Sequence, residues 1–172
     1  MFRVAAAAAC VFAFVAAPAE AAELFGGVFV HDVRSPLTKS GIEDGMDLQV
    51  GLRGDRIGRT PLQPYILASA HTAGQTHFAA VGLSAKFGDR FYIRPGLGVA
   101  VHTGDTGDFE DPGDDDIEFG SRILIEPELG IGFAIDDRSS IEASWVHLSH
   151  AQLLGGQNPG MDSFGLRFNL AF

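Results

Sequence analysis

Three residues near the end of the chain have the types and spacing needed for ester hydrolysis. His147 and Ser149 alternate with apolar residues on one segment, and Asp162 opens the next alternating segment. A serine becomes a good nucleophile when an imidazole takes its proton, and a carboxylate on the other ring nitrogen fixes the tautomer and stabilises the imidazolium. Residues two apart on one strand face lie roughly 6.5–7 Å apart along the backbone. The three side chains could therefore act as nucleophile, base and acid, if the fold brings them together.

The start of the chain has the features of a secretory signal peptide. Arg3 supplies a positive charge, an apolar run extends from Val4 to Ala17, and Ala19-Glu20-Ala21 matches a small-x-small cleavage site. The run is too short for a membrane-spanning helix. We expect cleavage after Ala21, which makes residues 1–21 a signal peptide and residues 22–172 a single domain. Cleavage also removes Cys10, the only cysteine, so no disulfide is expected.

Composition narrows the class of the exported domain. The formal net charge of −10 argues against nucleic acid as a partner. The chain contains 22 glycines and has a mean hydropathy of +0.14, yet it lacks a second long apolar run. Hydrophobicity that is spread over alternate positions is typical of a closed β-barrel in an outer membrane.

The pattern predicts an all-β fold, an eight-stranded antiparallel transmembrane β-barrel. The connections between the strands are alternately short and long, which is typical of barrels with turns at one end and loops at the other. The predicted strands are 24–32, 45–54, 63–73, 77–87, 90–102, 118–135, 139–149 and 161–172.

Alternation within the strands distinguishes a membrane barrel from a soluble ligand-binding barrel. Between residues 123 and 135 one face is mainly Ile, Leu and Phe, and the other is mainly Glu, Gly and Ala. A soluble barrel would turn the apolar face inward, but the polar face here carries too many glycines for a good solvent face. We therefore expect the apolar face to meet lipid and the small and charged face to fill a narrow lumen. Four arginines should pair in that lumen with Glu126, Glu128, Glu142 or Asp47, because an unpaired buried charge is costly: Arg53, Arg94, Arg122 and Arg167.

Strand direction and parity place the three candidate residues. With an even strand count and both termini in the periplasm, the strand 139–149 runs outward and ends near the outer leaflet. Trp145 suits the interface and Glu142, of opposite parity, cannot easily face lipid. His147 and Ser149 share the parity of Trp145, and Asp162 has the outward parity of its own strand. The three should face one patch of lipid, although His147 and Ser149 are also consistent with ordinary interfacial residues.

The C-terminal segment "HLSHAQLLGGQNPGMDSFGLRFNLAF" resembles the motif of the PagL-type outer-membrane lipid A 3-O-deacylases. The resemblance implies an eight-stranded barrel with a serine-hydrolase site on its lipid-facing wall. It matches His147 to the base, Ser149 to the nucleophile and Asp162 to the acid. The family usually has Asn after the serine as an oxyanion contributor, whereas this chain has His150. The imidazole of His150, or backbone N–H groups around Ala151, are possible replacements.

These features lead to two hypotheses of different class. The first is an outer-membrane esterase that hydrolyses the 3-O-linked acyl ester of lipid A, with lipopolysaccharide of the outer leaflet as its partner, no cofactor and a homodimer as one possible state. The second is a non-enzymatic small barrel that serves membrane integrity or adhesion. The remaining histidines lack metal-ligand spacing, and the acidic segment 104–118 is better explained as a solvated loop than as a calcium site. Asn158-Pro159-Gly160 is expected to form the turn into the last strand.

Overall fold

The computed structural model describes residues 22–38, 41–107, 116–150 and 159–172, and its regular secondary structure is entirely β-strand. No helix that could cross a lipid bilayer occurs among these residues. The strands are β1 (Glu23–Val30), β2 (Met46–Arg53), β3 (Leu62–His71), β4 (Phe78–Ala85), β5 (Phe87–Gly88), β6 (Phe91–His102), β7 (Ile123–Ala134), β8 (Ser139–Leu148) and β9 (Met161–Ala171).

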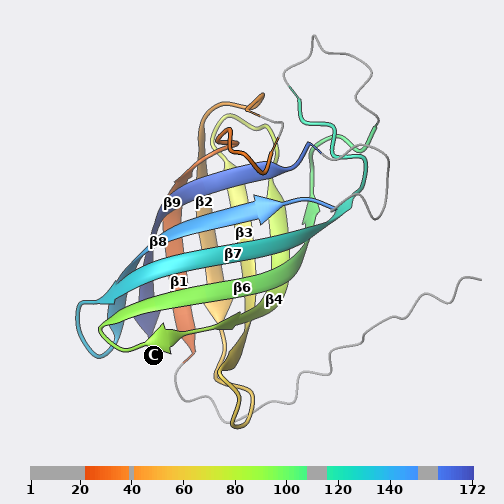
Figure 1. Cartoon of the computed structure of the whole chain (residues 1–172). Helices are drawn as coiled ribbons and strands as arrows, with labels where there is room; N and C mark the ends of the chain where they lie inside the picture. The colour runs from red at the N-terminus through yellow and green to blue at the C-terminus, as the bar shows by residue number, and fades with distance from the viewer. Residues whose placement is uncertain (1–21, 39–40, 108–115, 151–158) are drawn as a thin grey trace, which may run out of the picture.

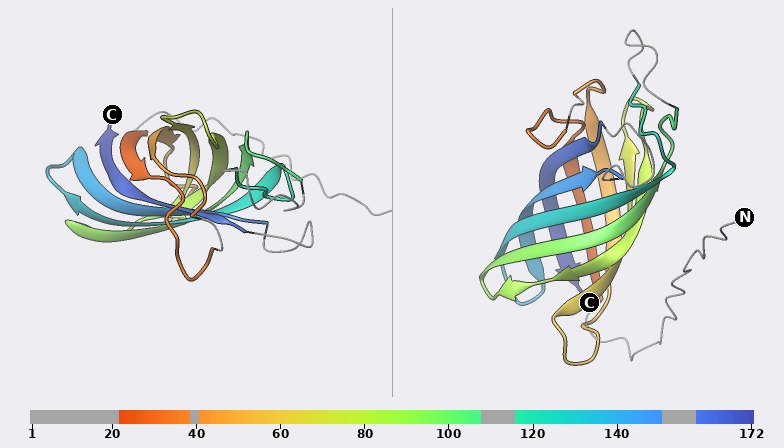
Figure 2. Two further views of the ribbon diagram at one scale, coloured as in Figure 1. Left: turned by 90° about the horizontal axis from the view of Figure 1, so that it is seen from above. Right: turned by 45° about the vertical axis from the view of Figure 1, so that its right-hand side comes forward.

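These strands form one antiparallel sheet that closes on itself (Figure 1). Consecutive long strands pair with one another, and the two ends of the sheet meet where β1 pairs with β9 over its whole length, from Glu23 opposite Ala171 to Val30 opposite Phe164. β4 pairs directly with β6, and the two-residue β5 pairs with the start of β6. Eight strands therefore make the wall, which confirms the predicted fold class, and they are tilted relative to the barrel axis (Figure 2).

The strand boundaries agree with the predicted ones to within two residues, except at the start of β7. The strand predicted at 118–135 begins only at Ile123, because Glu118 forms an isolated parallel bridge with Asp105 instead of continuing the ladder. The strand predicted at 77–87 ends at Ala85, and β5 follows separately. Both differences lie beyond the alternating cores of the strands, which match the prediction.

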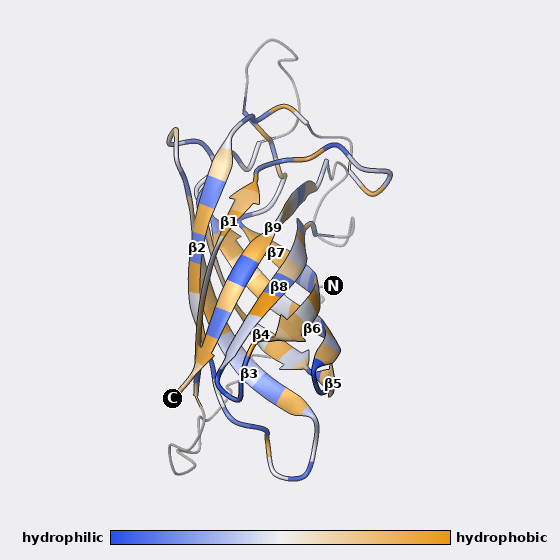
Figure 3. Cartoon of the chain, turned by 90° about the vertical axis from the view of Figure 1, so that its left-hand side faces the viewer, coloured by the Kyte–Doolittle hydropathy of each residue, from blue (hydrophilic) through white to orange (hydrophobic). Residues whose placement is uncertain are grey.

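The outer wall of the barrel is apolar, as the parity predicted. Phe91 is 76% exposed, Ile131 62% and Leu166 61%. Orange, hydrophobic segments alternate with paler or blue ones along the strands in Figure 3. A continuous exposed apolar surface of this extent marks contact with lipid.

The lumen is packed with side chains, and three of the four predicted arginines lie in it. Arg53, Arg94 and Arg167 are at most 2% exposed. Arg53 and Arg94 both form ion pairs with Glu23 at the start of β1, and Arg167 Nη1 donates to Glu128 Oε2 at 2.6 Å. The prediction was wrong for Arg122. That residue precedes β7 and is exposed, and its guanidinium donates to the carbonyl oxygens of His102 and Gly104.

Glycines on the inner face make room for the large lumen side chains. A Cβ at Gly132 would lie 2.0 Å from the Tyr92 ring, and one at Gly51 would lie 2.3 Å from the Phe25 ring. The abundance of glycine on the polar face therefore has a packing cause.

The two ends of the barrel differ. One end, the loop end, carries residues 31–38, 41–45, 72–77, 103–107 and 116–122 (Figure 1). The opposite end carries the short turns and both Glu23 and Ala171. His147 and Asp162 both lie at the loop end, since β8 finishes there and β9 begins there.

Candidate active site

His147 and Asp162 meet across the β8–β9 ladder, where the register places them directly opposite each other. His147 Nδ1 donates to Asp162 Oδ1 at 2.8 Å. Asp162 is fully buried, and His147 is 9% exposed. The carboxylate therefore fixes the proton of the imidazole on Nδ1, which leaves Nε2 as the ring nitrogen that could accept a proton.

The Asp162 carboxylate accepts two further hydrogen bonds. Trp145 Nε1 donates to Oδ1 at 2.7 Å, and the indole ring stacks beside the His147 ring with 5.9 Å between centroids. The hydroxyl of Ser35, from the loop between β1 and β2, donates to Oδ2. Trp145 and Ser35 thus share one carboxylate with His147, and this carboxylate is held at both oxygens.

Ser149 follows directly after β8 and lies two residues from His147. Its backbone is fixed by β7, because Ile125 N donates to Ser149 O at 2.7 Å and Ser149 N donates to Ile125 O at 3.1 Å. Ser149 is 9% exposed. Within the described residues no hydrogen bond joins the Ser149 hydroxyl to His147. Such bonds are often long in an enzyme without substrate and tighten only in the complex.

Gly160 lies close to the imidazole of His147. Its φ of +67° favours glycine, which is consistent with the predicted turn into β9; Asn158 of that turn lies outside the described residues. A Cβ at Gly160 would lie 3.2 Å from His147 Cε1 and 3.4 Å from Thr38 Cγ2. A side chain here would therefore press on the imidazole.

The two candidate oxyanion contributors, His150 and Ala151, follow Ser149 directly in the sequence. His150 is buried, at 1% exposure, immediately after Ser149. Ala151 lies outside the described residues. The proposed role of both stays a prediction.

Sequence reasoning brought together His147, Ser149 and Asp162 but missed two contributors. Trp145 was expected to be an interfacial anchor, and its shared parity with His147 could have indicated that its N–H reaches Asp162. Ser35 is 127 residues from Asp162 in sequence, and no local pattern marks it. Only the pairing of β1 with β9 brings it near.

Other histidines gather at the loop end without forming an evident metal site. In the part of the chain that the structure describes, no group of three or more His, Cys, Asp or Glu residues is arranged to hold a metal ion. Most of the acidic segment 104–118 lies outside that part.

Comparisons with known proteins identify a family model and solved structures that are similar to this chain. The family model described as lipid A 3-O-deacylase (PagL) matches residues 45–171. The crystal structure of the outer membrane enzyme PagL has a TM-score of 0.60 and 23% sequence identity, over 86% of this chain and 98% of that chain. No curated protein matches the chain.

Other membrane barrels share the fold at lower identity. De novo designed transmembrane β-barrels match with a TM-score of 0.57 and 8% identity, over 88% of this chain and 95% of the designed one. The Yersinia pestis outer membrane protein Ail matches with a TM-score of 0.51 and 10% identity, over 90% of this chain and all of Ail. These likenesses concern the barrel alone.

Proposed function

This chain belongs to the PagL family of lipid A 3-O-deacylases, and we propose that it cleaves the 3-O-linked acyl ester of lipid A with Ser149, His147 and Asp162 as its catalytic residues. The family and the fold identify it as a lipid A deacylase of the bacterial outer membrane. The resemblance of its C-terminal segment to this family is thereby confirmed. The identity of the catalytic residues is the proposal.

The observation that carries the proposal is the 2.8 Å contact between His147 Nδ1 and Asp162 Oδ1 on the outer wall of the barrel. Inside the lumen such a pair could only be structural, because no lipid ester reaches a core packed with side chains. On the lipid-facing wall it lies beside a serine, at the end of the barrel where the long loops lie.

The proposed reaction proceeds in two steps. In the first, Ser149 Oγ attacks the ester carbonyl carbon while His147 Nε2 takes the hydroxyl proton. The tetrahedral intermediate then collapses, the bond to the sugar oxygen breaks, and His147 returns the proton to that oxygen. In the second step water, deprotonated by His147, attacks the acyl-serine. The bond between the acyl carbon and Ser149 Oγ then breaks, His147 returns the proton to Oγ, and the fatty acid leaves.

Asp162 stabilises the imidazolium that forms in each step, and it holds the ring in the tautomer that keeps Nε2 free. His150 and the backbone N–H groups around Ala151 are the proposed donors to the oxyanion.

Release of the 3-hydroxy fatty acid from purified lipid A, followed by mass spectrometry, tests this mechanism. Ser149→Ala should abolish release, and His147→Ala should be similarly damaging because triad members act as a unit. Both variants should still fold, since each change removes atoms from the outer wall. Folding is checked by the shift in gel mobility between boiled and unboiled samples.

Ser121→Ala provides a matched control, because Ser121 lies at the same end of the barrel and its hydroxyl donates to the carbonyl of Ile123 instead of to the site. This variant should keep wild-type activity. Full activity in Ser149→Ala would rule out the serine mechanism. A wild-type protein that releases no acyl chain would favour the non-enzymatic barrel.

A further inference from the structure

The loop between β1 and β2, residues 31–45, touches the proposed catalytic acid directly. In addition to the Ser35 hydroxyl on Asp162 Oδ2, the Val33 N–H donates to the main-chain carbonyl of Asp162 at 2.7 Å. The loop thus continues the β1–β9 pairing beyond Val30, and its next residues pass close to the side chain of Asp162. Residues 39–40 of this loop lie outside the described residues.

The loop is fixed internally by Asp32. Its backbone φ of 44° lies in the left-handed region, which Asp tolerates better than most residues. Its Oδ2 accepts N–H groups from Gly41 at 2.7 Å, Ile42 at 2.8 Å and Glu43 at 3.2 Å. This carboxylate folds the second half of the loop back toward the first half.

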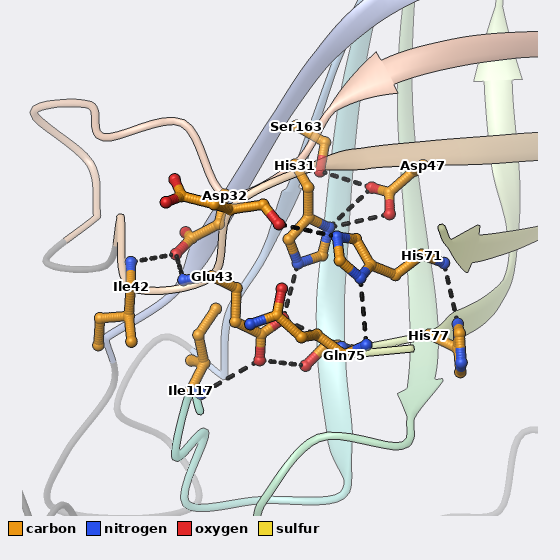
Figure 4. Close-up of polar contacts among 12 residues, drawn as sticks. His31, Asp32, Ile42, Glu43, Asp47, His71, Gln75, His77, Ile117 and Ser163 are labelled. Atoms are coloured by element: carbon orange, nitrogen blue, oxygen red, sulfur yellow. Dashed lines mark hydrogen bonds and ion pairs between the residues drawn. The ribbon is translucent and has the colours of Figure 1, made fainter. Parts of the chain in front are cut away.

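A buried cluster of hydrogen-bonded side chains holds this loop against the strands at the loop end of the barrel (Figure 4). His31 Nδ1 lies 2.9 Å from both oxygens of Asp47 on β2, and His31 Nε2 lies 2.7 Å from Glu43 Oε2. Glu43 also accepts the Thr76 hydroxyl at 2.8 Å and the Ile117 N–H at 3.2 Å. His31, Glu43 and Asp47 together form the clamp.

The clamp needs a charged imidazole. Both ring nitrogens of His31 face carboxylates, so each must carry a proton to donate. Burial alone would lower the pKa of His31, but the hydrogen bonds and charges of Asp47 and Glu43 outweigh it and raise the pKa to about 9. The neighbouring ring of His71 lies 4.4 Å away between centroids, and its Nδ1 accepts the Gln75 N–H.

The clamp and the proposed acid lie on opposite sides of the same wall. Asp162 points outward to His147, and the next residue, Ser163, points inward and donates to Asp47 Oδ2 at 3.3 Å. The loop links the inner and outer sides of the wall. Its residue Glu43 contacts His31 in the clamp, and its residue Ser35 donates to Asp162.

From this arrangement we propose that Ser35 is a positioning residue of the esterase, and that the clamp of His31, Glu43 and Asp47 sets the loop that presents it to Asp162. This inference rests on the proposed function, since it gives Asp162 the role of catalytic acid. The Ser35 hydroxyl holds Oδ2 and so restricts rotation of the carboxylate about its Cβ–Cγ bond. Oδ1 then stays aimed at His147 Nδ1.

Two consequences distinguish positioning from a general loss of structure. Removing the hydroxyl frees the carboxylate and should reduce kcat by about tenfold, the effect of losing one hydrogen bond to a charged group, while KM changes little. Restoring a hydroxyl at the same position should restore kcat, which a general loss of structure would not allow.

The experiment compares kcat and KM of the full chain, refolded in detergent, for Ser35→Ala, Ser35→Thr and Ser121→Ala. Ser35→Thr keeps a hydroxyl and should recover most of the activity that Ser35→Ala loses. Ser121→Ala should match the wild type. A wild-type kcat in Ser35→Ala would overturn the inference, as would equal losses of kcat in Ser35→Ala and Ser35→Thr.

The contribution of the clamp is tested by introducing His31→Gln into the wild type and into Ser35→Ala. Glu43→Gln replaces it if the His31→Gln variant does not fold. Because the clamp acts through Ser35, the double variant with Ser35→Ala should be hardly less active than Ser35→Ala alone. If the fold-losses of kcat in the two single variants multiplied in the double variant, the two sites would act independently and the coupling would be disproved. Activity of Ser149→Ala in the same series separates the two proposals: an inactive Ser149→Ala beside a fully active Ser35→Ala refutes only the inference.

Discussion

Replacing Asp162 by Asn separates the charge of the proposed acid from its geometry. Asp162 Oδ1 accepts from both His147 and Trp145, and Oδ2 accepts from Ser35. An amide can keep its oxygen on the first two donors and turn its NH₂ toward Ser35. A hydroxyl both donates and accepts, so Ser35 can rotate to accept from this NH₂. The asparagine should therefore retain the position of the carboxylate and the tautomer of His147.

The expected loss follows from the charge alone. Hydrogen bonds that involve an ionised partner are roughly twice as strong as neutral ones, and those to charged groups contribute about 1.5–3 kcal/mol. Because the imidazolium forms only during the reaction, this difference falls on the transition state. We expect kcat/KM to fall by about 10- to 150-fold in Asp162→Asn. In a triad whose asparagine forces the wrong tautomer the loss is about 10⁴-fold.

The assay is the initial rate of 3-hydroxy fatty acid release from lipid A in detergent micelles, at several substrate concentrations, with heat-modifiability as the folding control. Asp162→Ala, which also frees Trp145 and Ser35, should be less active than Asp162→Asn. A rate within about threefold of the wild type, which is less than 1 kcal/mol, would show that the charge has no catalytic role. If Asp162→Asn folded but lost as much activity as Ser149→Ala, the asparagine would not retain the geometry of the carboxylate.

Three further outcomes test the surrounding structure. Trp145→Phe keeps a ring beside His147 but removes the N–H that donates to Asp162 at 2.7 Å, so kcat should fall about three- to tenfold in the same assay, and an unchanged kcat would contradict the shared carboxylate. His31 has a folded pKa of about 9, above its ordinary value of 6.5, so its contribution is complete below pH 6.5 and is lost as the pH rises toward 9. The free energy of unfolding in urea should decrease by up to about 3 kcal/mol over that window, and His31→Gln should remove this slope. At Gly165 a Cβ would lie 2.3 Å from Val28 O and 2.7 Å from Phe29 Cα, so Gly165→Ala should lower the urea midpoint and the heat-modifiable fraction, whereas unchanged values would show that β1 can move away.

The fold could be predicted because strand parity is a local property. The alternation of Phe164, Leu166 and Phe168 with Gly165 and Arg167 is visible in the sequence, and it places each side chain on the wall or in the lumen. Arg122 was misplaced because the pattern does not mark where β7 begins. Parity does not predict the orientation of a side chain beyond the end of a strand, because the loop geometry determines it there.

The candidate site was predicted in part for the same reason. His147 and Asp162 are on adjacent strands, and their parity and position along the strands suffice to bring them together. Ser35 and the clamp depend on the closure of β1 against β9 and on the path of a loop, which no periodicity encodes. The charge on His31 likewise arises from two carboxylates that are distant in sequence.

The pairing of β9 with both β8 and β1 has a consequence for biogenesis. Asp162 receives His147 from β8 on one side and Ser35 from the β1 loop on the other, so its complete set of partners exists only after the last strand has joined the first. A chain in transit through the periplasm, with the ring still open, would lack the assembled acid. Hydrolytic competence would then emerge at the moment of insertion, in the membrane that holds the substrate, and would be withheld from lipids encountered on the way.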